Sequence, residues 1–299
     1  DIIERAIPML RMLCHGDGGL AVFHGVEHTN PAGVRAIFER DGVLGRPHSH
    51  AVYSGYCRMN QGHSTVIVDC GPPSICDSGL AFEFSEGPQR IVGSCGVPAN
   101  ASPAWRAAAQ SPAAHSTLQW EDKPAQNIQS ILGRKMRRAK PAPIAELAIS
   151  NHGTLFKAGN ASPATGLGHL HVRELFLASG GHDFRGEDYF ERIEPGAPAL
   201  NFAIRFHLHP SVKASADRKG AAIMLLLPNK DAWQFSALGG VMTLEESIYL
   251  AGGVGPRHSL QIVIRGSIES SNRINWAFKK RERQARHNGS AAAAPRLPF

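Results

Sequence analysis

Residues 78–84 read SGLAFEF, and residues 89–96, just beyond, read QRIVGSCG. Each stretch is a short apolar run of strand length, and Glu86, Gly87 and Pro88 between them are turn-forming residues. A third segment, residues 114–117 (AHST), begins a further run that ends at Trp120. The first two segments predict a β-hairpin, and the third predicts another strand.

The rest of the chain repeats this pattern on both sides of the hairpin. Its 31 glycines and 20 prolines divide it into short apolar runs without long helical periodicity after residue 20. Such spacing favours antiparallel sheets stacked on each other. We therefore predict an all-β fold, a large antiparallel β-sandwich with a short N-terminal helix and one helical turn near residues 105–110. The strands are expected at residues 20–23, 52–59, 65–69, 80–84, 90–95, 115–120, 144–149, 169–178, 183–193, 201–209, 221–227, 233–236, 241–250, 259–265 and 274–278.

Three parts of the chain differ in character. Residues 1–16 have a helical apolar stripe that stops at the turn HGDGG, residues 15–19. Residues 17–278 form the predicted sandwich, with an insertion or mobile loop at residues 121–143. Residues 279–299 are basic and then alanine-rich, and we expect a disordered tail.

The composition fits a globular chain whose partner is acidic. Hydrophobic residues make up 42% and charged residues 19%, and the net charge is +7. Much of the excess lies in two basic runs, residues 134–140 and 279–286, which read as solvated loop and tail. No aromatic residue interleaves with either run, so we expect no nucleic-acid partner.

This sequence lacks the signals that are typical of several classes of protein. No stretch approaches the ~20 apolar residues of a membrane span. Five cysteines without a CxxC spacing support neither a zinc knuckle nor a disulfide framework. There is no GxSxG nucleophile elbow, and no helical pattern follows the glycine-rich turn at residues 251–256.

Taken in order, the opening motifs resemble the β-sandwich domain of heparinase II/III-like polysaccharide lyases. Residues 16–23 (GDGGLAVF), 184–188 (FRGED), 204–210 (IRFHLHP) and 244–250 (LEESIYL) extend the resemblance over roughly residues 5–278. The resemblance implies an upstream α/α toroid, absent from this sequence, of which residues 1–16 would be the last turns. It also implies β-elimination on acidic, uronate-containing polysaccharides such as glycosaminoglycans, and a location in the periplasm or cell envelope.

The resemblance also suggests site residues. His115 and Tyr53 are candidate catalytic groups, because elimination needs an acid or base near neutral pKa. Tyr53 stands where related sequences can carry a histidine. Cys76, Asp77, Glu83 and Arg90 are candidate substrate-binding residues.

Some relatives hold a structural zinc with two histidines and an aspartate. Here Cys76 and Ser94 stand in place of two of those ligands and only His115 remains, so we expect no metal and no cofactor. His207 and His209, two apart on a predicted strand, are expected to share a face opposite Phe206 and Leu208 in a structural or solvent-facing role.

Three functions remain open: the sandwich part of a lyase, a noncatalytic carbohydrate-binding or assembly module, and a sandwich that supports a partner chain. Without the toroid, the chain alone is expected not to cleave. For His115 the alternative to catalysis is an imidazole that bonds a loop carbonyl and fixes the entrance of a strand.

Overall fold

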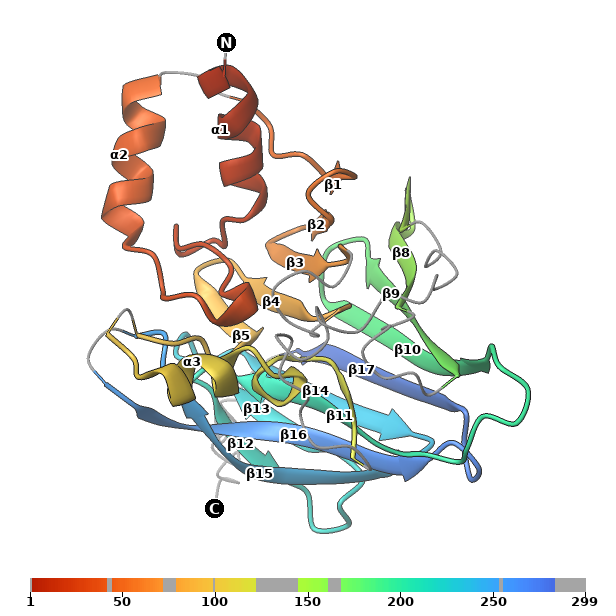
Figure 1. The fold of residues 1–299 in the computed structure, drawn as a ribbon. Helices are drawn as coiled ribbons and strands as arrows, with labels where there is room; N and C mark the ends of the chain where they lie inside the picture. The colour runs from red at the N-terminus through yellow and green to blue at the C-terminus, as the bar shows by residue number, and fades with distance from the viewer. Residues whose placement is uncertain are drawn as a thin grey trace, which may run out of the picture.

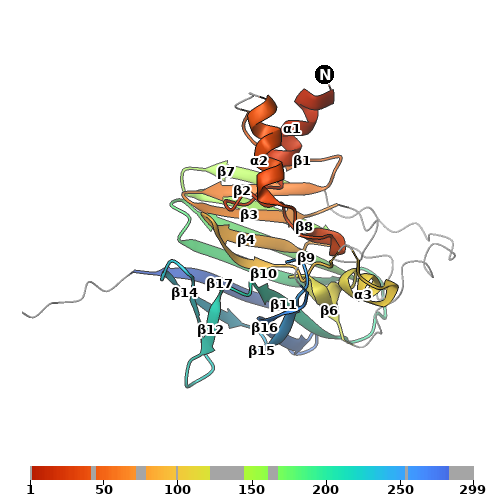
Figure 2. The ribbon, with the colours of Figure 1, turned by 90° about the vertical axis from the view of Figure 1, so that its left-hand side faces the viewer.

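The computed structural model describes residues 2–41, 45–71, 79–98, 100–121, 145–160, 168–252 and 255–282. These residues form two antiparallel sheets that pack face to face, with two helices projecting beyond them at the N-terminal end (Figures 1 and 2). The predicted all-β sandwich is confirmed.

The first sheet, sheet A, has the strand order β1-β2-β3-β4-β5-β11-β16-β15, and β6 also pairs with β11. Its strands are β1 His50–Ala51, β2 Tyr56–Gln61, β3 Ser64–Asp69, β4 Phe82–Glu86, β5 Gln89–Gly93, β6 Leu118–Trp120, β11 Asn201–Leu208, β15 Val241–Tyr249 and β16 Arg257–Ser267. The hairpin predicted from residues 78–96 is β4 and β5.

The second sheet, sheet B, has the order β12-β13-β14-β17-β10-β9-β8-β7. Its strands are β7 Glu146–Ser150, β8 Gly153–Asn160, β9 His169–Ala178, β10 Asp183–Arg192, β12 Lys213–Ala216, β13 Ile223–Leu226, β14 Ala232–Leu238 and β17 Arg273–Arg281. The strand β17 runs past the predicted end at residue 278.

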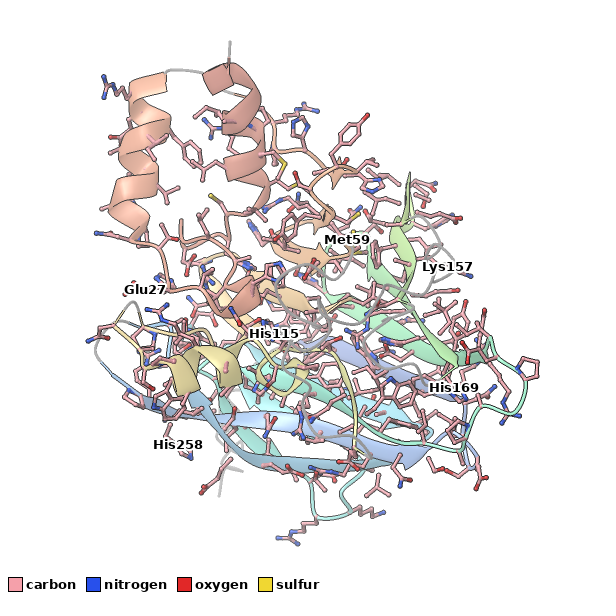
Figure 3. All side chains as sticks on the ribbon, in the orientation of Figure 1. Glu27, Met59, His115, Lys157, His169 and His258 are labelled. Atoms are coloured by element: carbon pink, nitrogen blue, oxygen red, sulfur yellow. The ribbon has the colours of Figure 1, made fainter. Side chains whose placement is uncertain are left out.

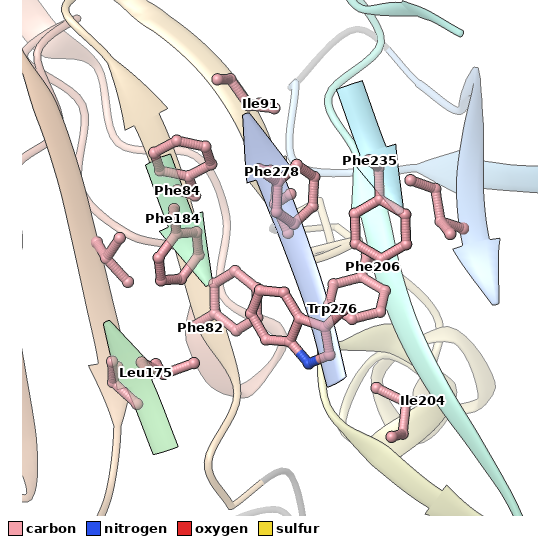
Figure 4. Close-up of a cluster of buried hydrophobic side chains, with 14 of the residues drawn as sticks. Phe82, Phe84, Ile91, Leu175, Phe184, Ile204, Phe206, Phe235, Trp276 and Phe278 are labelled. Carbon is pink, nitrogen blue, oxygen red and sulfur yellow. The ribbon is translucent and has the colours of Figure 1, made fainter. Parts of the chain in front are cut away.

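Aromatic side chains fill the space between the sheets. Phe82 and Phe84 of β4 alternate with polar residues, so both rings face sheet B (Figure 4). The Phe82 ring stacks on Trp276 with centroids 5.5 Å apart, and Phe84 meets Trp233 edge to face at 5.3 Å. Because side chains alternate along a strand, the neighbouring residues Glu83 and Ser85 lie on the outer face of sheet A.

A charged group also lies inside this core. Arg173 of β9 and Asp188 of β10 are register partners, and both side chains are fully buried. Arg173 Nε donates to Asp188 Oδ1 at 2.7 Å, and its Nη1 reaches across to the Leu80 carbonyl of the sheet A side at 2.7 Å. His171 Nε2 and Trp276 Nε1 donate to the same carboxylate at 2.6 and 2.8 Å. We call these four residues the Asp188 cluster.

The helices are α1 Ile2–Met12, α2 Pro31–Asp41 and α3 Pro103–Ala109, with 3₁₀ turns at Phe23–Gly25 and Pro112–Ala114. The N-terminal helix and the helical turn near residue 105 are confirmed. Figures 1 and 2 show α1 and α2 side by side, and Arg11 lies 4.1 Å from the centre of the Phe38 ring. None of the described helices is long and apolar enough to cross a membrane.

Several predicted elements were wrong. The prediction of a single N-terminal helix missed α2, although Asn30 caps it by accepting the Ala32 N–H at 2.9 Å and Pro31 is its first residue. The predicted strand at residues 20–23 is instead an irregular segment, in which Val22 N–H bonds the Glu83 side chain. The strands β8 and β12 were not predicted, and β6 starts at Leu118 rather than at His115.

Candidate functional site

The outer face of sheet A carries a buried polar cluster where the chain between α1 and α2 crosses it. Glu83 is 1% exposed. Its Oε1 accepts from Val22 N–H at 2.8 Å and its Oε2 from His15 Nε2 at 3.1 Å. The other ring nitrogen, His15 Nδ1, lies 2.7 Å from Ser85 Oγ. A neutral imidazole satisfies both contacts by donating at Nε2 and accepting at Nδ1.

Arg90 of β5 adds the positive charge. Its Nε donates to Asp17 Oδ2 at 2.7 Å, and its Nη1 lies 3.4 Å from Glu83 Oε2. Its Nη2 donates to Asp17 Oδ1 at 3.1 Å and to the Leu20 carbonyl at 3.0 Å. We call His15, Asp17, Glu83, Ser85 and Arg90 the Glu83 cluster. It ties the segment after α1 to sheet A.

Electrostatics in the Glu83 cluster favour two ionised carboxylates around one guanidinium. Burial alone raises the pKa of Glu83, but the His15 hydrogen bond and the charges nearby outweigh it, so its pKa lies below the ordinary value. For Asp17, bonds and charge from Arg90 likewise outweigh burial and lower the pKa. Burial, and then Arg90, lower the pKa of His15, which keeps the imidazole neutral.

A small pocket, partly open to solvent, adjoins this cluster. His207 on β11 and His209 just after it line the pocket beside Glu83 and Arg90, together with Tyr249 from β15. Phe206 and Leu208 belong to the core, so the predicted alternation is confirmed. The other lining residues are Val22, Gly93, Ser94, Cys95, Leu208, Ile248 and Ser259.

His207 is held in one neutral form. Its Nε2 donates to the Ala113 carbonyl at 2.9 Å, so Nδ1 accepts from Ser247 Oγ at 2.9 Å. Burial lowers its pKa to about 3. His209 Nδ1 bonds Ser211 Oγ at 2.7 Å, and its ring meets Tyr249 edge to face at 5.2 Å. Burial, and then Arg90, lower the pKa of His209 to about 4. At neutral pH the pocket thus offers neutral imidazoles.

His115, the first candidate catalytic residue, is completely buried between the N-terminal segment and the sheets (Figure 3). Its Nδ1 donates to the Ser111 carbonyl at 2.9 Å, and its Nε2 accepts from the backbone N–H of His24 at 3.1 Å. Burial lowers its pKa to about 4. Both ring nitrogens therefore bond backbone groups, and neither bonds Glu83 or Arg90.

The same bonds test the zinc site that the resemblance implies. A zinc ligand needs a free imidazole lone pair, and the Nε2 lone pair of His115 is used by His24 N–H. Ser94 offers a hydroxyl where an ionised carboxylate would be required. In the part of the chain that the structure describes, no group of three His, Cys, Asp or Glu side chains is arranged to hold a metal. Of the candidate ligands that the structure describes, His115 and Ser94 do not fit a zinc ion.

Three candidate residues remain. Tyr53 is fully exposed in the turn between β1 and β2. Cys76 and Asp77 fall outside the described residues. The structure thus brings Glu83 and Arg90 together, places His115 elsewhere in the interior, and leaves the catalytic and substrate-binding roles as predictions.

Sequence reasoning missed a further titratable group beside His115. His24 Nε2 lies 3.1 Å from Tyr56 Oη and 3.4 Å from Asp69 Oδ2. His24 adopts the left-handed conformation, φ +59°, which is unfavourable for a residue with a Cβ. Burial raises the pKa of Asp69 to about 7. The turn-forming residues after Asp69 were the only signal there, and they indicated a strand end rather than a site.

Comparison with known proteins agrees with this fold. The family model "Heparinase II/III-like, C-terminal" matches residues 44–277. A heparan sulfate lyase from Pedobacter heparinus superposes with a TM-score of 0.69 at 14% identity, over 92% of this chain and 46% of that one. A heparinase III gene product gives 0.70 at 11% identity, over 91% of this chain and 45% of that one. The chain therefore belongs to the heparinase II/III-like C-terminal domain family.

One relative of this chain is not named as a lyase. FtsZ-localized protein C of Caulobacter vibrioides (strain NA1000 / CB15N) is 29% identical over 299 residues, which cover 94% of this chain and 52% of the relative. The chain thus spans about half the length of the relatives it matches. That relative is named for its localisation with FtsZ, a cytoplasmic protein, so the expectation of a periplasmic or cell-envelope location is contradicted.

Proposed function

We propose that this chain is a noncatalytic binding module of the heparinase-like family, which works in the cytoplasm at an FtsZ-containing assembly. The observation that carries the proposal is the bonding of His115. Elimination requires a group that can take or give a proton at the substrate near neutral pH. The pKa of His115 is about 4, and both of its ring nitrogens are hydrogen-bonded to backbone groups.

The Glu83 cluster supports the same conclusion. Each Glu83 oxygen already accepts hydrogen bonds, and Arg90 is shared between Asp17 and Glu83. A guanidinium engaged in this way gives up existing bonds before it can neutralise a uronate carboxylate. The cluster is better suited to holding the segment after α1 on sheet A than to binding substrate.

The FtsZ-localized relative, whose match covers 94% of this chain, supports the proposed partner. A module that assembles with a cytoplasmic filament needs a rigid surface and no reactive base. The basic composition, with a net charge of +7, suits an acidic protein surface as well as an acidic polysaccharide.

A second candidate is the sandwich wall of a polysaccharide lyase acting on uronate-containing chains. The family match over residues 44–277 favours it. In that case Glu83 and Arg90 would face the substrate together with Cys76 and Asp77, and His115 or Tyr53 would take part in proton transfer. Such an enzyme would also need the upstream toroid.

Co-sedimentation distinguishes the two candidates. The purified chain is centrifuged with FtsZ assembled in GTP and, as the matched control, with FtsZ kept unassembled in GDP. We expect the chain in the GTP pellet and its loss at high salt, because ionic screening weakens surface attraction. A chain that stays in the supernatant but forms unsaturated uronate from an acidic polysaccharide would overturn the proposal.

A further inference from the structure

Two cysteines lie in contact at the end of the β2–β3 hairpin. Cys57 is on β2 and is completely buried, whereas Cys70 directly follows β3 and is partly exposed. Their sulfur atoms are 3.6 Å apart. Both are free thiols here. No part of the proposed function uses them.

The backbone holds the two thiols in this position. Cys57 pairs with Val68 in the β2–β3 register, and Cys70 N–H donates to the Gly55 carbonyl at 2.8 Å. Gly55, at φ +73°, packs so closely on Gly71 that a Cβ on Gly55 would lie 2.1 Å from Gly71 Cα. The chain on both sides of Cys70 is therefore fixed against the turn before Cys57.

The other described cysteines have different partners. Cys14 Sγ donates to the Leu10 carbonyl at 3.2 Å, and Cys95 Sγ lies 3.5 Å from His207 Nδ1. Only Cys57 and Cys70 make a sulfur-to-sulfur contact among residues 2–41, 45–71, 79–98, 100–121, 145–160, 168–252 and 255–282.

We propose that Cys57 and Cys70 form a reversible oxidation site, a dithiol at rest that becomes a disulfide when a peroxide is present. A disulfide bond is about 2.05 Å long, so the sulfurs must approach by roughly 1.5 Å. We assign this approach to the side chain of Cys70, which is partly exposed, because its backbone is held by the bond to Gly55.

The chemistry balances with hydrogen peroxide as the oxidant. The Cys70 thiolate attacks one peroxide oxygen, which breaks the O–O bond and gives a sulfenic acid and hydroxide. The Cys57 sulfur then attacks the Cys70 sulfur, and the sulfenic hydroxyl leaves as water. In sum, two thiols and one peroxide yield one disulfide and two waters. The hydrogen bond with Cys57 and burial raise the pKa of Cys70, so the first step is slow at neutral pH and faster in alkali.

The proposed oxidation site adjoins the His24 site. Asp69 precedes Cys70, and its Oδ1 accepts from Gly71 N–H at 3.4 Å while its Oδ2 faces His24 Nε2 at 3.4 Å.

The test is peptide mapping of the intact, folded chain after peroxide treatment. Remaining thiols are alkylated before digestion without reductant. Trypsin cuts after Arg58 and so places Cys57 and Cys70 on separate peptides, which a disulfide joins. Cys76 shares the peptide of Cys70, so the experiment is done in wild type and in Cys76→Ser, with Cys14→Ser as the matched control.

We expect the joined peptides in wild type, in Cys76→Ser and in Cys14→Ser, and separate peptides again after reduction. Cys70→Ala should lower the joined fraction at least about tenfold, since the buried Cys57 contacts no other cysteine sulfur among the residues that the structure describes. Cys57→Ala is a second test and should agree, provided that its melting temperature shows a folded chain. Both thiols fully alkylated after peroxide, or a joined fraction that disappears in Cys76→Ser, would overturn the proposal.

Discussion

The two buried ionic clusters of this protein differ in what they connect. The Asp188 cluster lies inside the sandwich, where Arg173 of sheet B bonds both Asp188 and carbonyls of the sheet A side. The Glu83 cluster lies on the outer face of sheet A and binds the segment after α1. Both contain a histidine of lowered pKa hydrogen-bonded to a carboxylate. A buried histidine and carboxylate in this fold therefore indicate attachment between parts of the chain, and do not by themselves indicate catalysis.

Removing Asp188 should have the largest effect. Asp188→Ala leaves the Arg173 charge in the core without a counterion, and we expect a loss of about 3–5 kcal/mol in the free energy of unfolding. Urea denaturation measures it. Asp183→Ala, on the same strand but in an exposed pair with Arg185, is the matched control and should cost at most about 1 kcal/mol. Similar losses for the two variants would show that the Asp188 cluster does not stabilise the sandwich.

Breaking the Glu83 cluster should cost less. Glu83→Gln keeps the shape but removes the charge that Arg90 and His15 N–H bond, so we expect a loss of about 1.5–3 kcal/mol. Because the cluster holds the segment after α1, hydrogen exchange should also rise at Val22. Glu246→Gln, whose side chain is 89% exposed, should stay within about 0.5 kcal/mol. Unchanged exchange at Val22 in Glu83→Gln would contradict the attachment role.

The buried histidines predict a loss of stability in mild acid. The folded pKa of His115, about 4, is below its ordinary value of 6.5, so the unfolded chain binds more protons between these values. Stability is therefore complete above pH 6.5 and falls as the pH drops toward 4, by about 2–3 kcal/mol for this residue. His207 adds to the fall, while Asp69, with its pKa raised to about 7, opposes it.

His115→Gln tests the histidine contribution directly. This variant should be less stable at pH 7, because the bonds to Ser111 and His24 are altered, and its stability should change less between pH 6.5 and 4. Urea midpoints across that range measure both quantities. A wild-type slope retained in His115→Gln would assign the acid sensitivity to other groups.

Tyr53 should show the smallest effect. Its side chain is fully exposed and belongs to neither cluster. Tyr53→Phe should therefore change the free energy of unfolding by less than about 0.5 kcal/mol. A larger loss in thermal melts would mean that the β1–β2 turn bears on the fold.

Sequence reasoning predicted the sheets well and the site only in part. Alternation in residues 206–208 is a local signal, and it correctly assigned Phe206 and Leu208 to the core, opposite His207. The partners of Glu83 could not be predicted, because His15 and Val22 lie more than sixty positions away and bond through an irregular segment. The same holds for His115, whose role depends on the backbone N–H of His24, 91 positions away.

We infer that His115 positions the chain and does not transfer protons. The most direct measurement is unsaturated-uronate formation by the full gene product on a panel of acidic polysaccharides, with wild type and His115→Gln compared alongside their melting temperatures. We expect no turnover by either protein and a lower melting temperature for His115→Gln. Turnover by wild type that is lost in His115→Gln at an unchanged melting temperature would contradict it.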